Sequence, residues 1–206
     1  MRLPFVAQTG CCSVCARPVE GFGGEYLCEE CRRNRPFFDR AATALWFDGD
    51  ARRMLLDFKF NAHLWLRDDF ADWLDAAMHA RFNVSAVDLV VPMPSSPLHR
   101  WDRGYSQCEP LARCLSGMIA RRFDPHVLVR RGGATRQSSL PEAARRENVK
   151  NTFAVVRPES VRGRTALVVD DVLTTGSTFS EAARVLKDAG ASRVWVVALA
   201  RSTRCC

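Results

Sequence analysis

Apolar runs and segments of helical periodicity alternate along most of the chain. The apolar runs predict strands at residues 41–47, 87–91, 127–129, 152–156, 165–169 and 194–200. Helical spacing of apolar residues predicts helices at 50–60, 64–81, 104–122, 141–151 and 178–189. Continuous apolar strands between helices are typical of a parallel sheet with helices on both faces. The pattern therefore predicts an α/β fold from residue 41 onward.

Residues 1–40 lack this periodicity and are rich in cysteine. The spacing Cys12-x2-Cys15, a 12-residue spacer and Cys28-x2-Cys31 suits a tetrahedral zinc bound by four thiolates. A segment this short cannot bury a large apolar core, so a metal would stabilise its fold directly. Cys11-x3-Cys15 is also feasible, and we choose Cys12 for its symmetry with the second pair. We expect a structural zinc ribbon at 1–40, followed by a second domain at 41–206.

The composition is that of a globular protein. The chain has 206 residues, of which 47% are hydrophobic and 26% charged, and this excludes extensive disorder or fibrous repeats. Its longest apolar run, 194–200, is far shorter than a membrane span of about 20 residues, and the N-terminus is too polar for a signal peptide. We therefore expect a cytoplasmic protein without membrane insertion, whose cysteines bind metal rather than form disulfides.

The net charge of +7 is concentrated in one stretch of the chain. Residues 96–164 hold 14 Lys and Arg against 6 Asp and Glu, whereas the rest is nearly neutral. This distribution favours a phosphate-rich partner, either a small molecule or a nucleic acid. Most of the basic residues are arginine, which suits forked contacts to phosphate, although a GC-rich genome would give the same excess.

The segment ALVVDDVLTTGST at 166–178 carries the most informative motif. Asp170 and Asp171 follow a buried apolar strand, at the edge where parallel α/β sheets bind ligands. The polar loop after them consists of Thr174, Thr175, Gly176, Ser177 and Thr178. Its backbone N–H groups, its hydroxyls and the following helix N-terminus suit a phosphate, and Gly176 allows close approach. Because the two carboxylates would repel a phosphate, we expect them to face sugar hydroxyls, Mg²⁺ or both.

Two motifs resemble those of known families. VVDDVLTTGST resembles the phosphoribosyl-pyrophosphate motif of type I phosphoribosyltransferases. Together with the cysteine segment and VVPMPSSPLHRWDRGYSQ, the chain resembles the ComF family over nearly its whole length. This resemblance implies a type I phosphoribosyltransferase-like parallel sheet preceded by a four-cysteine zinc ribbon. It also implies that Asp170 and Asp171 bind the ribose hydroxyls of Mg²⁺-bound phosphoribosyl pyrophosphate and that 174–178 hold its 5′-phosphate.

By the same resemblance, two basic loops complete the site. One follows the strand at 87–91 and would bind pyrophosphate through Arg100 and Arg103. The other is a flexible loop that would close over the site and contains Arg130, Arg131 and Arg136. Lys59 is a further candidate for phosphate contact, although a lysine on a helix surface is equally plausible. We interpret Arg103 as catalytic together with the two aspartates, because charge stabilisation is the chemistry that they offer.

Two interpretations of function stay open. The leading one is an enzyme, a glycosyltransferase of the phosphoribosyltransferase type that acts on an unidentified acceptor. The alternative, in line with the competence and DNA-uptake link of the ComF family, is a non-catalytic module that binds the ligand and single-stranded DNA. Proteins of the competence machinery are further candidate partners. Cys108 and Cys114 are interpreted as packing residues, and Cys205 and Cys206 as a frayed tail.

Overall fold

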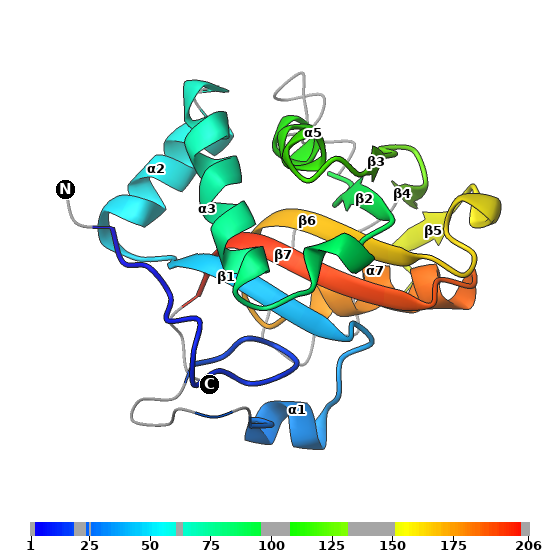
Figure 1. Ribbon diagram of the computed structural model, residues 1–206, viewed down its shortest axis with the longest axis horizontal. Coiled ribbons are helices and arrows are strands. Elements are labelled where there is room, and N and C mark those ends of the chain that lie inside the picture. The colour runs from blue at the N-terminus through cyan, green and yellow to red at the C-terminus, as the bar shows by residue number, and fades with distance from the viewer. Residues whose placement is uncertain are drawn as a thin grey trace.

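A five-stranded parallel sheet forms the centre of the protein (Figure 1). The computed structural model describes residues 3–18, 24, 26–60, 64–95, 108–131 and 151–202. The strands lie side by side in the order β1-β7-β6-β2-β3, and every pairing is parallel. Their bounds are β1 Arg40–Trp46, β2 Leu89–Pro92, β3 Arg122–Phe123, β6 Thr165–Leu173 and β7 Arg193–Arg201. The sheet confirms the predicted α/β class, and β6 and β7 are the apolar runs that predicted buried strands.

Helices cover both faces of this sheet, as expected. One face packs against α2 Gly49–Phe60, α3 Arg67–His79 and α5 Cys108–Met118, and the other against α7 Ser177–Asp188 (Figure 1). Phe70 of α3 and Leu115 of α5 are fully buried on the first face. Phe179 of α7 is buried on the second face, where the core also includes the four cysteines of the two CxxC pairs. The connections contain the short helices α1 Glu29–Arg33, η1 Leu64–Leu66, η2 Val84–Ala86 and η4 Pro158–Ser160.

The helix expected at 104–122 differs from the observed one at its end. In the described part of the chain, α5 ends at Met118, and Arg122–Phe123 form the edge strand β3 instead of a last helical turn. Met118 was expected to face inward, but it is 44% exposed because the helix leaves the core there. The helix expected at 141–151 lies almost wholly outside the described residues. Among the helices that the structure describes, none is both long and apolar enough to cross a bilayer.

The weak strands expected at 127–129 and 152–156 do form, but they do not join the parallel sheet. They appear as β4 Leu128–Arg130 and β5 Phe153–Val155, an antiparallel pair of their own. Phe153 and Leu128 are buried against the α7 face of the core. This pair places Arg130, at the end of β4, near Asp170 of β6.

The outer edge of β1 is paired with the N-terminal segment, residues 3–8. The N–H of Val6 donates to the carbonyl of Ala44 (2.8 Å), and the N–H of Trp46 donates to the carbonyl of Pro4 (2.8 Å). The side-chain amide of Gln8 donates to the carbonyl of Thr43 (3.0 Å). The cysteine-rich segment follows directly, so the chain enters it from the edge of the sheet.

Candidate functional site

Asp170 and Asp171 lie within β6 rather than after it. The expected strand ended at residue 169, but β6 continues to Leu173 because β7 stays paired with it as far as Arg201. On its other side β6 loses its partner earlier, since the last pairing with β2 is Val169 with Pro92. Among the described residues, the two half-buried aspartates therefore stand on a strand extension with one neighbouring strand, β7.

The loop after the aspartates has the conformation expected of a phosphate-binding turn. Gly176 precedes α7 with φ of 81°, a left-handed conformation that glycine adopts without strain. The hydroxyls of Thr175 and Ser177 are 2.9 Å apart, and the N–H of Ser177 donates to Thr175 Oγ1 (3.3 Å). The first turn of α7 adds a partial positive charge at the same place. Residues 174–178, which we call the phosphate loop, are thus arranged to receive an anion.

Cys108 and Arg130 lie beside Asp170, and of these two only Arg130 was expected near the site, in the loop that would close over it. The Cys108 thiol, at the start of α5, donates to Asp170 Oδ1 (3.1 Å), although Cys108 was interpreted as a packing residue. Arg130, at the end of β4, lies over the Phe153 ring at 5.6 Å. Burial lowers the pKa of Arg130, and attraction to the Asp170 carboxylate opposes that shift. No sequence pattern links Cys108 to the aspartates, because this contact depends on how α5 packs.

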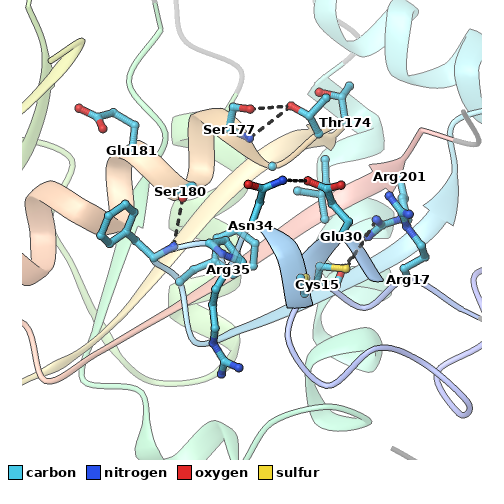
Figure 2. A pocket seen from close by; sticks show the side chains of 17 residues that line it. Cys15, Arg17, Glu30, Asn34, Arg35, Thr174, Ser177, Ser180, Glu181 and Arg201 are labelled. Carbon is cyan, nitrogen blue, oxygen red and sulfur yellow. Dashed lines mark hydrogen bonds between the residues drawn. The ribbon is translucent and has the colours of Figure 1, made fainter. Parts of the chain in front are cut away.

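A cavity of about 280 Å³ separates the phosphate loop from the cysteine-rich segment (Figure 2). Residues 174–177 form one wall, and Arg17, Glu30, Asn34 and Arg35 contribute to the other. The Glu30 carboxylate accepts a hydrogen bond from the Asn34 amide (3.1 Å). This volume is close to the lower limit for small-molecule sites, about 300 Å³. A group of the size of a heterocyclic base can therefore lie between the two walls.

A second cavity, of about 170 Å³, lies where β2 ends. Its lining includes Ser95, Glu109 and Arg130. Within the described part of the chain, the Ser95 hydroxyl is buried without a hydrogen-bond partner. A buried hydroxyl in that state costs free energy unless a ligand or water pairs with it. The loop that was expected to bind pyrophosphate thus begins at a polar cavity, which Arg130 also lines.

The four cysteines of the two CxxC pairs lie together in the core. Their sulfur atoms, from Cys12, Cys15, Cys28 and Cys31, are all within 4.8 Å of one another. The sulfurs of Cys15 and Cys28 are 3.7 Å apart, and four thiolates around zinc at about 2.3 Å would be separated by about 3.8 Å. The donor set therefore fits a tetrahedral metal such as zinc.

Cys11 is excluded from this cluster by its direction. Its thiol donates to the carbonyl of Ala7 (2.9 Å), and burial raises its pKa. The choice of Cys12 over Cys11 is therefore consistent with the geometry. Within the cluster, hydrogen bonds from Cys15 and then from Cys31 lower the pKa of Cys12, while hydrogen bonding to Cys12 and then to Cys15 raises the pKa of Cys31. A bound cation would favour the thiolate form of these cysteines, because it would offset their mutual repulsion.

Two arginines from the α/β domain hold the first CxxC pair. Arg201, at the end of β7, is 4% exposed and donates to the Cys15 carbonyl at 2.5 Å. Its second nitrogen lies 3.9 Å from the Cys15 sulfur (Figure 2). Arg81, after α3, donates to the Cys12 carbonyl at 2.7 Å. Neither arginine was singled out by the sequence, since both contacts join residues far apart in the chain.

Several predicted site residues remain predictions. Arg100, Arg103 and Arg136 lie outside the described residues, and only the backbone of Lys59 is described, in α2. Arg130 and Arg131 were expected in a flexible loop. Instead Arg130 ends β4, and the backbone N–H of the exposed Arg131 donates to the Thr152 carbonyl (2.7 Å).

Comparison with known proteins agrees with this architecture. Residues 112–205 match the family described as phosphoribosyl transferase domain. Competence protein F of Haemophilus influenzae is 29% identical over 213 residues, which cover 96% of this chain and 93% of that protein. DNA utilization protein YhgH of Escherichia coli O6:H1 is 29% identical over 221 residues, 98% of this chain and 95% of that protein.

One solved structure that aligns with part of this chain is that of a purine-biosynthesis enzyme. The allosteric regulatory enzyme of purine biosynthesis aligns with 64% of this chain at 22% identity and a TM-score of 0.42, and this chain spans only 25% of that protein. The parallel sheet and the matched residues define the class, a phosphoribosyltransferase-type domain. With a four-cysteine cluster before that domain, the chain is similar over nearly its full length to competence protein F and DNA utilization protein YhgH, in line with its resemblance to the ComF family.

Proposed function

We propose that the protein binds phosphoribosyl pyrophosphate with Mg²⁺ and transfers the phosphoribosyl group to an acceptor. The observation that carries the proposal is the half-paired extension of β6, which presents Asp170 and Asp171 directly before the phosphate loop. Vicinal ribose hydroxyls donate well to carboxylates, while the N–H groups and hydroxyls of the loop donate to the 5′-phosphate. A single ligand that carries both groups fits this order.

The cavity at the end of β2 supports a place for the pyrophosphate. It adjoins Arg130, whose positive charge lies near Asp170, and it contains the Ser95 hydroxyl, which has no hydrogen-bond partner among the described residues. Arg100 and Arg103, a few residues further along the chain, are proposed to add positive charge there. Mg²⁺ would neutralise the pyrophosphate oxygens as the bond to ribose breaks.

Positioning and charge stabilisation are the proposed sources of catalysis. Thr174, at the start of the phosphate loop, has no basic group to take a proton from the acceptor. Acceptor and sugar would instead be held together, with water excluded from the cationic sugar. We place the acceptor in the 280 Å³ cavity, because it adjoins the phosphate loop and offers donors and acceptors on Arg17, Glu30 and Asn34.

The names of the relatives connect the function to competence and DNA utilisation. We propose that the present protein also acts on or near incoming DNA, in the cytoplasm, where reducing conditions keep four cysteines available for zinc. Competence-machinery proteins are proposed partners. The second candidate function is binding of the ligand and of single-stranded DNA without turnover. It would require the same ribose site to bind its ligand without catalysing a transfer.

Asp170→Asn with Asp171→Asn tests the proposal. Loss of two charged acceptors, each contributing about 1.5–3 kcal/mol, should weaken binding of phosphoribosyl pyrophosphate with Mg²⁺ at least a hundredfold in calorimetry. Asp68→Asn with Asp69→Asn is a matched control, since it changes another adjacent pair, exposed on α3. Unchanged affinity in the first variant would refute the ribose site. Pyrophosphate release during a screen of nucleobases then separates the enzyme from the silent module.

A further inference from the structure

Four arginines lie at the N-terminal ends of the strands, and the two aspartates lie near the C-terminal end of β6, on the opposite side of the sheet's length. Arg40 begins β1, Arg193 begins β7, Arg122 begins β3, and Arg164 directly precedes β6. Strand pairing brings three of them close to one line: Thr165, next to Arg164, pairs with Arg193, and Leu89 of β2 pairs with Arg122 on one side and with Ala166 of β6 on the other. Arg40 pairs with Trp195, two residues further along β7 than Arg193. We call these four residues the arginine row.

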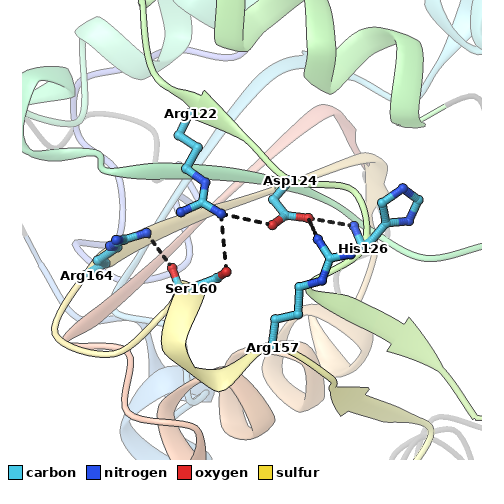
Figure 3. A network of polar contacts seen from close by, with 6 residues as sticks. All are labelled: Arg122, Asp124, His126, Arg157, Ser160 and Arg164. Carbon is cyan, nitrogen blue, oxygen red and sulfur yellow. Dashed lines mark hydrogen bonds and ion pairs between the residues drawn. The ribbon is translucent and has the colours of Figure 1, made fainter.

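Connecting segments add more arginines next to the row. These are Arg121, Arg157 and Arg162. Figure 3 shows Arg122 and Arg157 on either side of the buried Asp124 carboxylate, at 3.4 and 3.5 Å. Four acidic residues, Asp39, Asp88, Asp124 and Glu159, lie at the same end of the sheet. Seven guanidinium groups against four carboxylates leave this end with a surplus of positive charge.

Fold stability explains only part of this arrangement. Arg164 donates to the Ser160 carbonyl (2.9 Å), Arg40 to the Arg81 carbonyl (3.3 Å), and Arg122 to the Ser160 hydroxyl (3.3 Å). Cations near helix C-termini also stabilise those helices. A guanidinium has five N–H donors, however, and these contacts use one or two of them. The side chains of Arg122 and Arg157 remain 49% exposed.

We propose that the arginine row binds the sugar–phosphate backbone of a nucleic acid. Five strands spaced about 4.8 Å apart give the row a length of about 19 Å. Along the axis of B-form DNA, with one phosphate of each strand per about 3.4 Å, that length spans five or six phosphates of one strand. A repeated anion therefore fits the row better than a single phosphate or pyrophosphate does. Arginine suits this ligand because its planar fork matches phosphate oxygens.

The row is suited to the backbone rather than to bases or a membrane. Of the exposed aromatic side chains among the described residues, Phe5 and Trp65 belong to segments away from this edge, and Phe37 lines the 280 Å³ cavity. Stacking on aromatic rings gives single-strand preference, and aromatic anchors strengthen contact with bilayers. Without them, binding at the row should ignore sequence and accept single strands and duplexes alike.

Fluorescence anisotropy with a labelled 20-nucleotide strand and its duplex tests the proposal. If four to six phosphates are neutralised, log K should fall with log salt at a slope of about −3 to −4 for the single strand. The variant Arg40→Gln, Arg162→Gln, Arg193→Gln should bind about a hundredfold more weakly at 0.1 M salt and flatten the slope by about 2. The lysine triple variant at these positions should retain most binding, because charge is kept.

The matched control removes three exposed arginines elsewhere, Arg32→Gln, Arg52→Gln and Arg53→Gln. Equal losses in the control and the row variant would overturn the proposal, as would binding confined to the single strand. Row-dependent binding to phosphatidylserine vesicles without oligonucleotide binding would also overturn it. Asp170→Asn with Asp171→Asn should leave oligonucleotide binding intact, so the row and the ribose site can fail separately.

Discussion

Replacing Arg201 by methionine would test how the cysteine-rich segment is fixed to the sheet. Arg201 is 4% exposed and donates to the Cys15 carbonyl at 2.5 Å. Methionine keeps the unbranched apolar stem that packs at the end of β7 but has no donor. The Cys15 carbonyl, next to a proposed metal ligand, would lose its charged partner.

The expected cost follows from that single contact. A hydrogen bond to a charged group contributes about 1.5–3 kcal/mol, and the carbonyl would be left without a protein donor. For a domain of this size, about 2 kcal/mol corresponds to a fall in Tm of roughly 4–8 °C. Because Arg201 also lies 3.9 Å from the Cys15 sulfur, the segment should release its metal faster as well.

Two measurements on the zinc-loaded protein check this reasoning. Calorimetry gives the shift in Tm, and a colorimetric chelator gives the rate of metal release. Arg193→Met, at the exposed start of the same strand, should shift stability by no more than about 0.5 kcal/mol. If Arg201→Met melted and released metal like the wild type, the contact would not hold the segment to the sheet.

Two further substitutions probe the metal cluster and the phosphate loop. Cys12→Ser should lose bound zinc during chelator titration whereas Cys11→Ser retains it, because only the Cys12 sulfur lies in the cluster; equal retention would contradict the assigned ligand set. Gly176→Ala should cost about 1 kcal/mol from its φ of 81° and weaken phosphoribosyl pyrophosphate binding. Gly190→Ala, with φ of 99° and a new Cβ only 3.3 Å from a neighbouring side chain, should destabilise more but leave that binding unchanged.

Local sequence signals predicted the elements that depend on local interactions. The apolar run at 165–169 and the helix expected at 178–189 correspond to β6 and α7, and the CxxC spacing corresponds to a real sulfur cluster. Each signal is contained in short stretches of the chain. The phosphate loop was recognisable for the same reason, because a glycine directly before a helix indicates a left-handed turn from the local sequence alone.

Features that depend on distant partners were not predictable in the same way. The extension of β6 past residue 169 exists because β7 remains paired with it, and a strand pattern contains no information about the length of its neighbour. The antiparallel β4–β5 pair and the position of Arg130 follow from packing against α7. The contact between Arg201 and Cys15 joins residues 186 positions apart. Such contacts form only once the whole core has packed, so a local pattern in the sequence does not indicate them.

The pairing of residues 3–8 with β1 has a consequence for any shortened version of this protein. Of the two sheet borders, one is only two residues long at β3, and the other is sealed by this N-terminal stretch. In a truncated chain beginning at Arg40, the outer amides and carbonyls of β1 would lack hydrogen-bond partners, and the residues of this strand are mostly apolar and buried in the full protein. It would be prone to self-association through that border, however intact its remaining layers were.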